Sequence, residues 1–280
     1  MEKILVFGAG AYARTILPQL VKNYCVIGFV DNKCADGGGE FEGYPILNID
    51  SLLNTDYDIV IVASTVAMTS IVEQLVHMGI ERQKINTDYV IIPVKSRVAF
   101  LENLAELFTT QGITGSVAEG GVFQGEFAKE INRVFFNQHL YLFDTFEGFD
   151  LRDTNVDKAK GFSDSDAGHL STTSKELVIK KLPHPDIVTV RKGYFPESAH
   201  DIVCESFCFV NLDFDLYMPT YEGLKFFAPR MAPGGVILVH DYFNEIYRGV
   251  KEAVHEFLNY QDVRLSLFPV GDGVSVGIQC

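Results

Sequence analysis

Two segments of the chain share a pattern that strongly restricts its fold: a short apolar run ends in closely spaced glycines, and a helical pattern follows. The segments are KILVFGAGAYA at residues 3–13 and SVAEGGVFQGEFA at residues 116–128. Strands that alternate with helices are typical of parallel sheets covered on both faces. Two glycine turns, one after the other along the chain, therefore predict an α/β protein with two Rossmann-like, doubly wound sheets.

The boundary between the two predicted domains lies near residue 93. Residues 1–93 are expected to form a Rossmann-like domain of about four strands, and helical spacing predicts a connecting helix over 94–107. Residues 94–280 form the second domain, which ends in two strand-like runs around Gly271-Asp272-Gly273, a strong signal for an antiparallel hairpin. The other expected strands are short apolar runs at 3–8, 25–31, 58–64, 116–118, 140–143, 187–191, 207–212 and 236–239.

The composition fits two packed cores and excludes several classes of protein. Hydrophobic residues make up 47 % of the 280, which excludes disorder for most of the chain. The formal net charge of -14 disfavours binding to nucleic acid or to anionic lipid. No signal peptide or membrane span is evident, so we expect a cytoplasmic protein. The five scattered cysteines predict no zinc site, and Cys204 and Cys208 are expected to be buried thiols.

A segment of twenty-five residues, 150–174, shows no hydrophobic periodicity. Connections longer than about 12–15 residues inside a compact domain are usually binding loops, lids or disordered segments. We expect a loop that covers the substrate, with a disordered insertion as the alternative.

The first glycine turn has the spacing of a dinucleotide-binding fingerprint. Gly8, Gly10 and Ala13 fit GxGxxG/A, and Asp31 ends the next predicted strand 21 residues after Gly10. Such glycines let the backbone approach a phosphate at a helix N-terminus, and the carboxylate can accept ribose hydroxyls. A tight turn without a ligand remains the alternative.

Residues 1–90 resemble the N-terminal nucleotide-sugar-binding domain of bacterial sugar-modifying acetyltransferases. The resemblance rests on the runs GAGAYA, GFVDN, FEGYPIL and DIVIVAS. It implies that Gly8, Gly10 and Asp31 contact a nucleotide-sugar or a related ligand.

The second glycine turn is acidic where a phosphate-binding turn would be basic. It contains Glu119, Gly120, Gly121 and Gly125 and no Lys or Arg. A carboxylate in this place suits a ligand with an ammonium or sulfonium charge, and the glycines allow close approach of the ligand's methionine part. Asp144 ends the following strand, 19 residues past Gly125, where it can accept two ribose hydroxyls.

Further acidic residues follow two later strands, and parallel strands place their carboxyl ends on one edge of a sheet. Asp213 and Asp215 follow CFVNL, and His240 with Asp241 follows GGVILV. Carboxylate oxygens are the ligands that Mg²⁺ prefers, so Asp213, Asp215 and Asp241, together with the imidazole of His240, are candidate metal ligands. Solvated or turn-capping carboxylates are the alternative. His169 and His200 are weaker candidates for a base, since exposed loop histidines are common.

Residues 95–280 resemble the macrocin-type O-methyltransferases, which methylate sugars of antibiotics and coumarins and depend on S-adenosylmethionine (SAM) and Mg²⁺. The matching runs are VAEGGVFQGEFA, LFDTFEGF, VRKGYFPESA, VNLDFDLYMPTYEG, GGVILVHDYF and RGVKEAVHEFL. The resemblance implies a class I methyltransferase fold. It also implies a cofactor site made by Glu119, Gly120, Gly121, Gly125, Asp144, Phe146, Gly193 and Tyr194, of which the last two lie near the adenine.

The same resemblance maps the metal ligands of the family onto Asp213 and Asp241. His240 stands where the family usually has a further aspartate. Imidazole binds Mg²⁺ poorly but can serve as a base, so Asp213 and His240 are the candidate catalytic residues.

We therefore expect a SAM-dependent O-methyltransferase that acts on a sugar or sugar-containing small molecule with the help of Mg²⁺. The first domain would hold a nucleotide-linked part of the substrate or serve in assembly of a homo-oligomer. Two alternatives remain: an NAD(P)-dependent oxidoreductase, and a non-catalytic nucleotide-sugar-binding protein of polysaccharide biosynthesis.

Overall fold

The computed structural model describes residues 1–34, 36–65, 67–202, 205–259 and 265–280. The chain divides into two compact units, Met1–Lys95 and Ser96–Cys280, and the division falls within a long helix. Within the described residues, no helix combines the length and apolar character needed to cross a bilayer. Cys208 is buried, as expected, whereas Cys204 lies outside the described residues.

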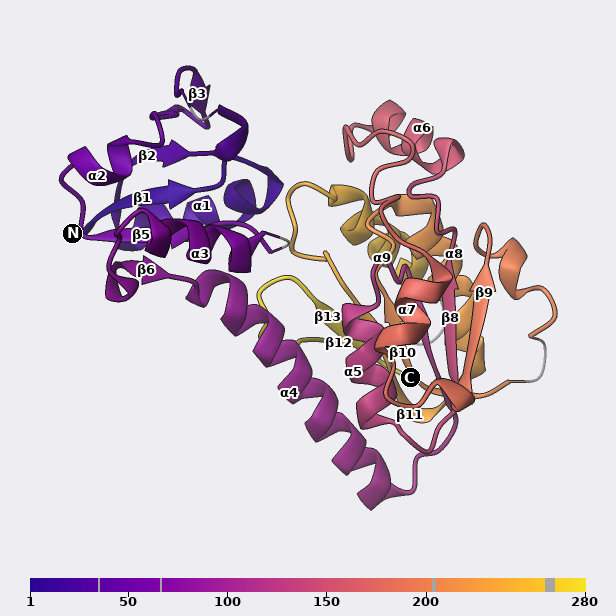
Figure 1. Ribbon diagram of the computed structural model, residues 1–280. Coiled ribbons are helices and arrows are strands. Elements are labelled where there is room, and N and C mark those ends of the chain that lie inside the picture. The colour runs from indigo at the N-terminus through magenta and orange to yellow at the C-terminus, as the bar shows by residue number, and fades with distance from the viewer. Residues whose placement is uncertain (35, 66, 203–204, 260–264) are drawn as a thin grey trace. The chain divides into compact units, whose positions relative to one another are not determined.

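The first unit is a parallel sheet of four strands in the order β2-β1-β5-β6 (Figure 1). Alternate residues of its central strand point to opposite faces, because side chains alternate along a strand. Ile4 and Val6 pack with helix α1, whereas Leu5 and Phe7 pack with helix α3. The elements are β1 (Lys3–Phe7), α1 (Ala11–Asn23), β2 (Cys25–Val30), β3 (Glu40–Phe41), β4 (Tyr44–Pro45), α2 (Ser51–Asn54), β5 (Ile59–Val62), α3 (Met68–His77) and β6 (Ile85–Asn86).

Helix α4 (Asp88–Gln111) is longer than the connector expected over 94–107. It includes Pro93, whose ring nitrogen cannot donate the helical hydrogen bond to the carbonyl four residues earlier. That carbonyl belongs to Tyr89, and it accepts the hydroxyl of Tyr12 instead. The helix therefore continues through the proline, because a side chain from the first unit satisfies the carbonyl that Pro93 leaves free.

The second unit contains a mixed sheet of seven strands in the order β12-β13-β11-β10-β7-β8-β9 (Figure 1). Strands β7 to β11 run parallel, β13 pairs antiparallel with β11, and β12 pairs antiparallel with β13. The predicted terminal hairpin is thus confirmed. The elements are β7 (Ser116–Gly120), α5 (Glu126–Val134), β8 (Leu140–Asp144), α6 (Leu151–Lys160), α7 (Lys175–Lys181), β9 (Val188–Lys192), β10 (Phe207–Leu212), α8 (Tyr217–Phe227), β11 (Met231–Val239), α9 (Arg248–Asn259), β12 (Ser266–Pro269) and β13 (Val276–Gln279).

Two apolar clusters cover the two faces of this sheet. One includes side chains of α4, α5 and α7, and the other includes side chains of α8 and α9. Helices on both faces make this sheet doubly wound, as expected. The carboxyl ends of the parallel strands are left open at one edge, which is where the candidate site lies.

The prediction of a loop over residues 150–174 is wrong for the first part of this segment, where Leu151–Lys160 form helix α6. Asp150 caps the helix by accepting the backbone N–H of Arg152, and Gly161 ends it in the left-handed conformation. The buried face of the helix is polar, with Asp153, Thr154 and Asp157 at 4 %, 1 % and 0 % exposure. Since apolar periodicity is the main signal for a helix, a helix that buries polar residues escapes it.

Candidate active site

A cavity opens where the parallel strands of the second unit end. Gly121, Asp144, Gly193 and Asp213 line it, and they lie at or just after the ends of β7, β8, β9 and β10. The empty space inside it, including the part open to solvent, is ≈ 630 Å³. It lies at the place where open α/β sheets bind ligands.

The wall of the cavity is aromatic and acidic. Among the described residues that line it, none is Lys, Arg or His. Its aromatic side chains are Phe123, Phe143, Phe149, Tyr194, Phe195 and Phe214, and its acidic ones are Asp144, Asp150, Asp153, Asp213 and Asp215. Aromatic faces and carboxylates both attract cations, so the cavity favours a cationic ligand over a phosphate.

The glycine turn after β7 is fixed by close backbone packing. Gly121 has φ +80°, and a Cβ there would lie 2.0 Å from the carbonyl oxygen of Asp213. A Cβ on Gly120 would lie 2.3 Å from the ring of Phe214. Gly125 has φ +79° and begins helix α5, but it packs against Val178 and does not line the cavity.

Glu119 is buried behind the turn and is not part of the cavity wall. Its Oε1 accepts the side-chain amide of Asn211 at 2.9 Å, while its Oε2 has no hydrogen-bond partner. Burial, together with the charge of Asp213, raises the pKa of Glu119 well above its ordinary value. The predicted contact between Glu119 and a cationic ligand therefore stays a prediction.

Asp144 holds the glycine turn in place. Its Oδ2 accepts the backbone N–H groups of Val122 and Phe123 at 2.7 and 2.9 Å, and its Oδ1 accepts that of Phe146 at 2.6 Å. A carboxylate has about four acceptor sites, so these bonds leave little capacity for the ribose hydroxyls expected there. Phe146 itself packs into the core and does not line the cavity.

The first unit repeats this arrangement on a smaller scale. The carboxylate of Asp31 accepts the backbone N–H of Ala9, between Gly8 and Gly10, at 2.8 Å, and also that of Lys33 at 2.8 Å. Gly8 has φ +113°, and a Cβ there would lie 2.8 Å from the carbonyl oxygen of Ala63. In both units, the acid at the end of the second strand stabilises the preceding glycine turn.

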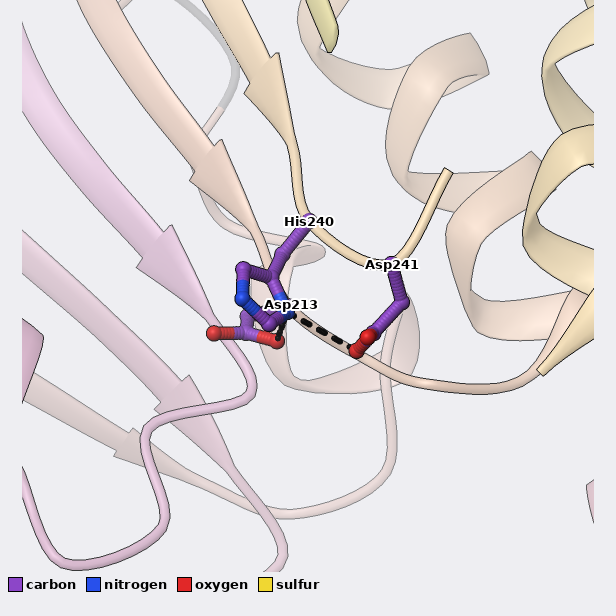
Figure 2. A group of neighbouring side chains, drawn as sticks. All are labelled: Asp213, His240 and Asp241. Atoms are coloured by element: carbon purple, nitrogen blue, oxygen red, sulfur yellow. Dashed lines mark hydrogen bonds and ion pairs between the residues drawn. The ribbon is translucent and has the colours of Figure 1, made fainter. Parts of the chain in front are cut away.

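The structure brings Asp213, His240 and Asp241 together beyond the ends of β10 and β11 (Figure 2). His240 Nδ1 lies 2.9 Å from Asp213 Oδ1 and 2.8 Å from Asp241 Oδ2. Burial alone would lower the pKa of His240, but the two carboxylates raise it well above its ordinary value. Of the three, only Asp213 lines the cavity, although the side chain of His240 is as exposed as that of Asp213, at 21 % against 22 %.

Asp215 also faces the cavity, in a left-handed conformation with φ +63°. Burial and the charges of Asp241 and Asp213 raise the pKa of Asp215 well above its usual range, which favours a neutral carboxyl group. Burial would also raise the pKa of Asp241, but His240, Asp215 and Asn244 hold it below its ordinary value. The neutral acid thus stands beside an ionised one.

Arg97 is a site residue that the sequence analysis missed. It belongs to the part of α4 within the second unit, and its guanidinium lies 4.3 Å from the centre of the Phe127 ring. Its Nη1 is 3.6 Å from Asp213 Oδ2, an ion pair too long for a direct hydrogen bond. The sequence did contain a signal for Arg97, a charged residue on an apolar helix face. Leu101, Leu104 and Phe108 follow it at helical spacing, and all three are buried.

Asp153 is a second residue that sequence reasoning missed. It lines the cavity from helix α6 and accepts the hydroxyl of Tyr194 at 2.8 Å. Burial raises the pKa of Asp153 to about 6. The guanidinium of Arg152 stacks 3.5 Å from the centre of the Tyr194 ring and fixes this side of the cavity.

The other two candidate histidines lie outside the cavity. His169 is exposed, and its ring contacts that of Phe149 edge to face. His200 is exposed, with Nδ1 3.0 Å from the carbonyl oxygen of Glu197. Neither is placed to act as a base on a ligand in the cavity.

The contacts of Asp213, His240 and Asp241 do not fit a Mg²⁺ site. Mg²⁺ takes oxygen ligands and usually keeps several waters, whereas one of these three groups is an imidazole. The imidazole nitrogen nearest the carboxylates is already shared between them. Asp241 Oδ1 accepts the side-chain amide of Asn244 at 2.6 Å, and Asp213 Oδ2 faces Arg97. Protein groups thus already contact the carboxylate oxygens that a metal would bind.

Comparison with known proteins shows the family. A family model described as macrocin-O-methyltransferase (TylF) matches residues 70–276, and one described as C2185-like, N-terminal, matches residues 1–86. Mycinamicin III 3''-O-methyltransferase of Micromonospora griseorubida is 25 % identical over 173 residues, which cover 58 % of this chain and 67 % of that protein.

Solved structures of O-methyltransferases have the same fold. NovP matches with a TM-score of 0.53 and 20 % identity, covering 66 % of this chain and 79 % of its own. CalS11, a calicheamicin methyltransferase, matches with a TM-score of 0.50 and 17 % identity, covering 82 % of this chain and 88 % of its own. With the strand order of the second unit, these likenesses confirm the class I methyltransferase fold. The chain therefore belongs to the macrocin O-methyltransferase family and is an O-methyltransferase.

Proposed function

We propose that this enzyme transfers a methyl group from SAM to a hydroxyl of a sugar or of a sugar-containing small molecule. The observation that carries the proposal is the lining of the cavity. It has five carboxyl groups and six aromatic rings, and no basic side chain among the described residues. Such a wall suits a sulfonium cation and disfavours the diphosphate of NAD(P). It therefore also argues against the oxidoreductase alternative in this unit.

The residues present fit SAM in shape as well as in charge. A Cβ added to Gly193 would meet only Ser198, at 3.6 Å, so the backbone there is accessible to a ligand beside Tyr194. On the other side, the turn at Gly121, which Asp144 holds in place, would receive the amino-acid part, and the acidic wall would face the sulfonium. When bound, SAM would supply a methyl group on a positively charged sulfur; an oxygen nucleophile attacks the methyl carbon in line, and the sulfur leaves as a neutral thioether.

Asp213 is placed to remove the proton of the acceptor hydroxyl. Of Asp213, His240 and Asp241, it is the one that lines the cavity. A carboxylate within hydrogen-bond distance of a hydroxyl can serve as a general base. His240 and Arg97 orient its two oxygens. Holding the two reactants in attack geometry contributes up to roughly 7–11 kcal/mol to lowering the barrier, so the walls of the cavity matter as much as the base.

Calorimetry and labelled methyl transfer test the proposal. S-adenosylhomocysteine (SAH) is expected to bind to the full-length chain. SAM with a labelled methyl group is expected to give a labelled product with at least one acceptor from a panel of deoxysugar glycosides and nucleotide-linked deoxysugars. Binding of NADH without any response to SAH would reverse the assignment, and binding of SAH and nucleotide-sugars without turnover on the whole panel would favour the non-catalytic alternative.

We propose separately that the first unit binds a nucleotide or nucleotide-sugar at Gly8, Gly10 and Asp31. The supporting observation is that a Cβ at Gly10 would meet no atom of the described residues within 4 Å, so the start of helix α1 is open to a ligand. A Gly10→Trp variant should lose binding of uridine and thymidine diphosphate sugars and keep binding of SAH. Unchanged nucleotide-sugar binding by the variant would contradict this assignment.

A further inference from the structure

The group formed by Asp213, His240 and Asp241 already has nitrogen atoms of the protein beside its carboxylates. The imidazole of His240 lies between Asp213 Oδ1 and Asp241 Oδ2 (Figure 2). The guanidinium of Arg97 faces Asp213 Oδ2. The fourth oxygen, Asp241 Oδ1, accepts the side-chain amide of Asn244. Each oxygen of the two carboxylates therefore faces a nitrogen of the protein.

We propose that this enzyme carries out methyl transfer without a divalent metal ion, with the side chains of His240 and Arg97 occupying the place of a metal at Asp213 and Asp241. The inference rests on the proposed function, because it describes the same site. It differs from the sequence-based expectation of Mg²⁺, which followed from a resemblance to a family that usually has an aspartate at position 240.

Arg97 places a guanidinium group beside Asp213, where a metal ion would have to bind. Its guanidinium stacks on Phe127, and its side chain is only 14 % exposed. An arriving divalent cation would lie beside this fixed positive charge. It would also have to displace the imidazole and the amide of Asn244 from the carboxylate oxygens. Both requirements weaken binding of a metal ion.

The same contacts explain how Asp213 can act alone. A carboxylate that has one oxygen on an imidazole and the other near a guanidinium is oriented without a metal, and acceptor capacity remains on both oxygens. Because Asp213 lines the cavity and His240 and Asp241 do not, a substrate hydroxyl in the cavity would meet the carboxylate of Asp213. Without a metal to lower the pKa of the acceptor hydroxyl, removal of its proton depends on the nearby carboxylate alone.

The test is metal binding, measured on the full-length protein without turnover. Purified wild-type chain is titrated with Mg²⁺ and with Mn²⁺ by calorimetry, and its metal content is measured by mass spectrometry. We expect no saturable binding in the millimolar range and no bound transition metal. The variant His240→Asp removes the imidazole and adds a third carboxylate, so its affinity for Mg²⁺ should rise at least about tenfold.

His200→Asp is the matched control, since it introduces the same charge at an exposed position outside the cavity, and it should leave Mg²⁺ affinity unchanged. Saturable binding of Mg²⁺ or Mn²⁺ to the wild-type chain, or a rise in affinity in the control equal to that in His240→Asp, would overturn the proposal. If His240→Asp does not fold, the wild-type titration still decides. Binding of SAH in the same calorimeter tests the methyltransferase assignment separately.

Discussion

Asp213 joins the cavity to the charged residues beside it. It is partly buried, with 22 % of its side chain exposed, and each of its oxygens has a cationic neighbour. Glu119 and Asp241, by contrast, are almost fully buried and have no surface on the cavity. Among the acids predicted from the ends of the strands, the structure thus separates those that line the cavity, Asp144, Asp213 and Asp215, from those that do not, Glu119 and Asp241.

Asp213→Asn should reduce the rate of methyl transfer by about 10²–10⁴-fold, the usual contribution of a general base, because the amide cannot accept the proton. Binding of SAH should change little, since the amide keeps the shape of the wall. The measurement is labelled methyl transfer combined with SAH calorimetry. Asp186→Asn, at an exposed position outside the cavity, is the control. Full activity of Asp213→Asn would remove Asp213 from the mechanism.

Gly121→Ala should disrupt the second glycine turn. Its Cβ would lie 2.0 Å from the carbonyl oxygen of Asp213, in addition to the strain of φ +80°. Gly112→Ala is the matched control, because Gly112 has φ +69° and no atom within 4 Å of the added Cβ, so only the strain of about 1–2 kcal/mol applies. Urea unfolding and SAH calorimetry should show a larger loss of stability for Gly121→Ala, with loss of SAH binding. Equal losses in the two variants would show that the close contact is unimportant.

At the scale of elements, helix α6 shows how a functional wall can be built against the usual rules of burial. Its inward face carries carboxyl groups, of which Asp153 accepts the Tyr194 hydroxyl and Asp157 accepts the backbone N–H of Tyr217 at 3.1 Å. Asp157 Oδ2 has no hydrogen-bond partner. The helix is therefore held by polar contacts to the cavity wall and to the start of α8.

Asp157 should make stability depend on pH. Burial raises the pKa of Asp157 from 3.8 to about 6, so the folded state holds its proton more tightly than the unfolded state. Stability from this group is therefore greatest below about pH 4, falls as the pH rises to about 6, and stays lower above that. Relative to the wild type, Asp157→Asn should gain roughly 1–3 kcal/mol in free energy of unfolding between about pH 4 and about pH 7.

Urea unfolding of the two proteins across this range measures the effect. Asp164→Asn is the control, because it makes the same chemical change at an exposed position of the same segment. A difference between Asp157→Asn and wild type that does not vary with pH would show that Asp157 does not titrate in this range in the folded chain.

At the scale of the whole molecule, the chain has two units with separate apolar cores. Two clusters of buried residues lie in the first unit and two in the second. Each unit has its own glycine turn and its own acid that binds that turn. Ligands of the two turns should therefore stabilise different parts of the chain.

Scanning calorimetry of the full-length chain should show two unfolding transitions, of which SAH raises only one. At a free concentration of about 100 times its Kd, SAH should stabilise the second unit by about 2.7 kcal/mol. Asp213→Asn, which should still bind SAH, serves as the control and is expected to shift in the same way. A single transition that SAH moves as a whole would mean that the two units unfold together.

The sequence by itself determined the two sheets, the terminal hairpin and the family, because those depend on local patterns. Apolar runs that end in glycine, and acids that follow them, are legible along the chain, and the carboxyl ends of parallel strands must share an edge. The same reasoning predicted that Asp213, His240 and Asp241 lie close together, and the structure confirms that they do.

Only the tertiary structure decided what each of these residues faces. Whether an acid points into a cavity or into the core depends on partners distant in sequence, such as Asn211 for Glu119 or the turn N–H groups for Asp144. Arg97 and helix α6 escaped prediction because a buried charge and a buried polar face oppose the apolar pattern on which sequence reasoning depends. The physical reason is that burial of a polar group is tolerated only when its partners are in place, and those partners are brought together by the fold.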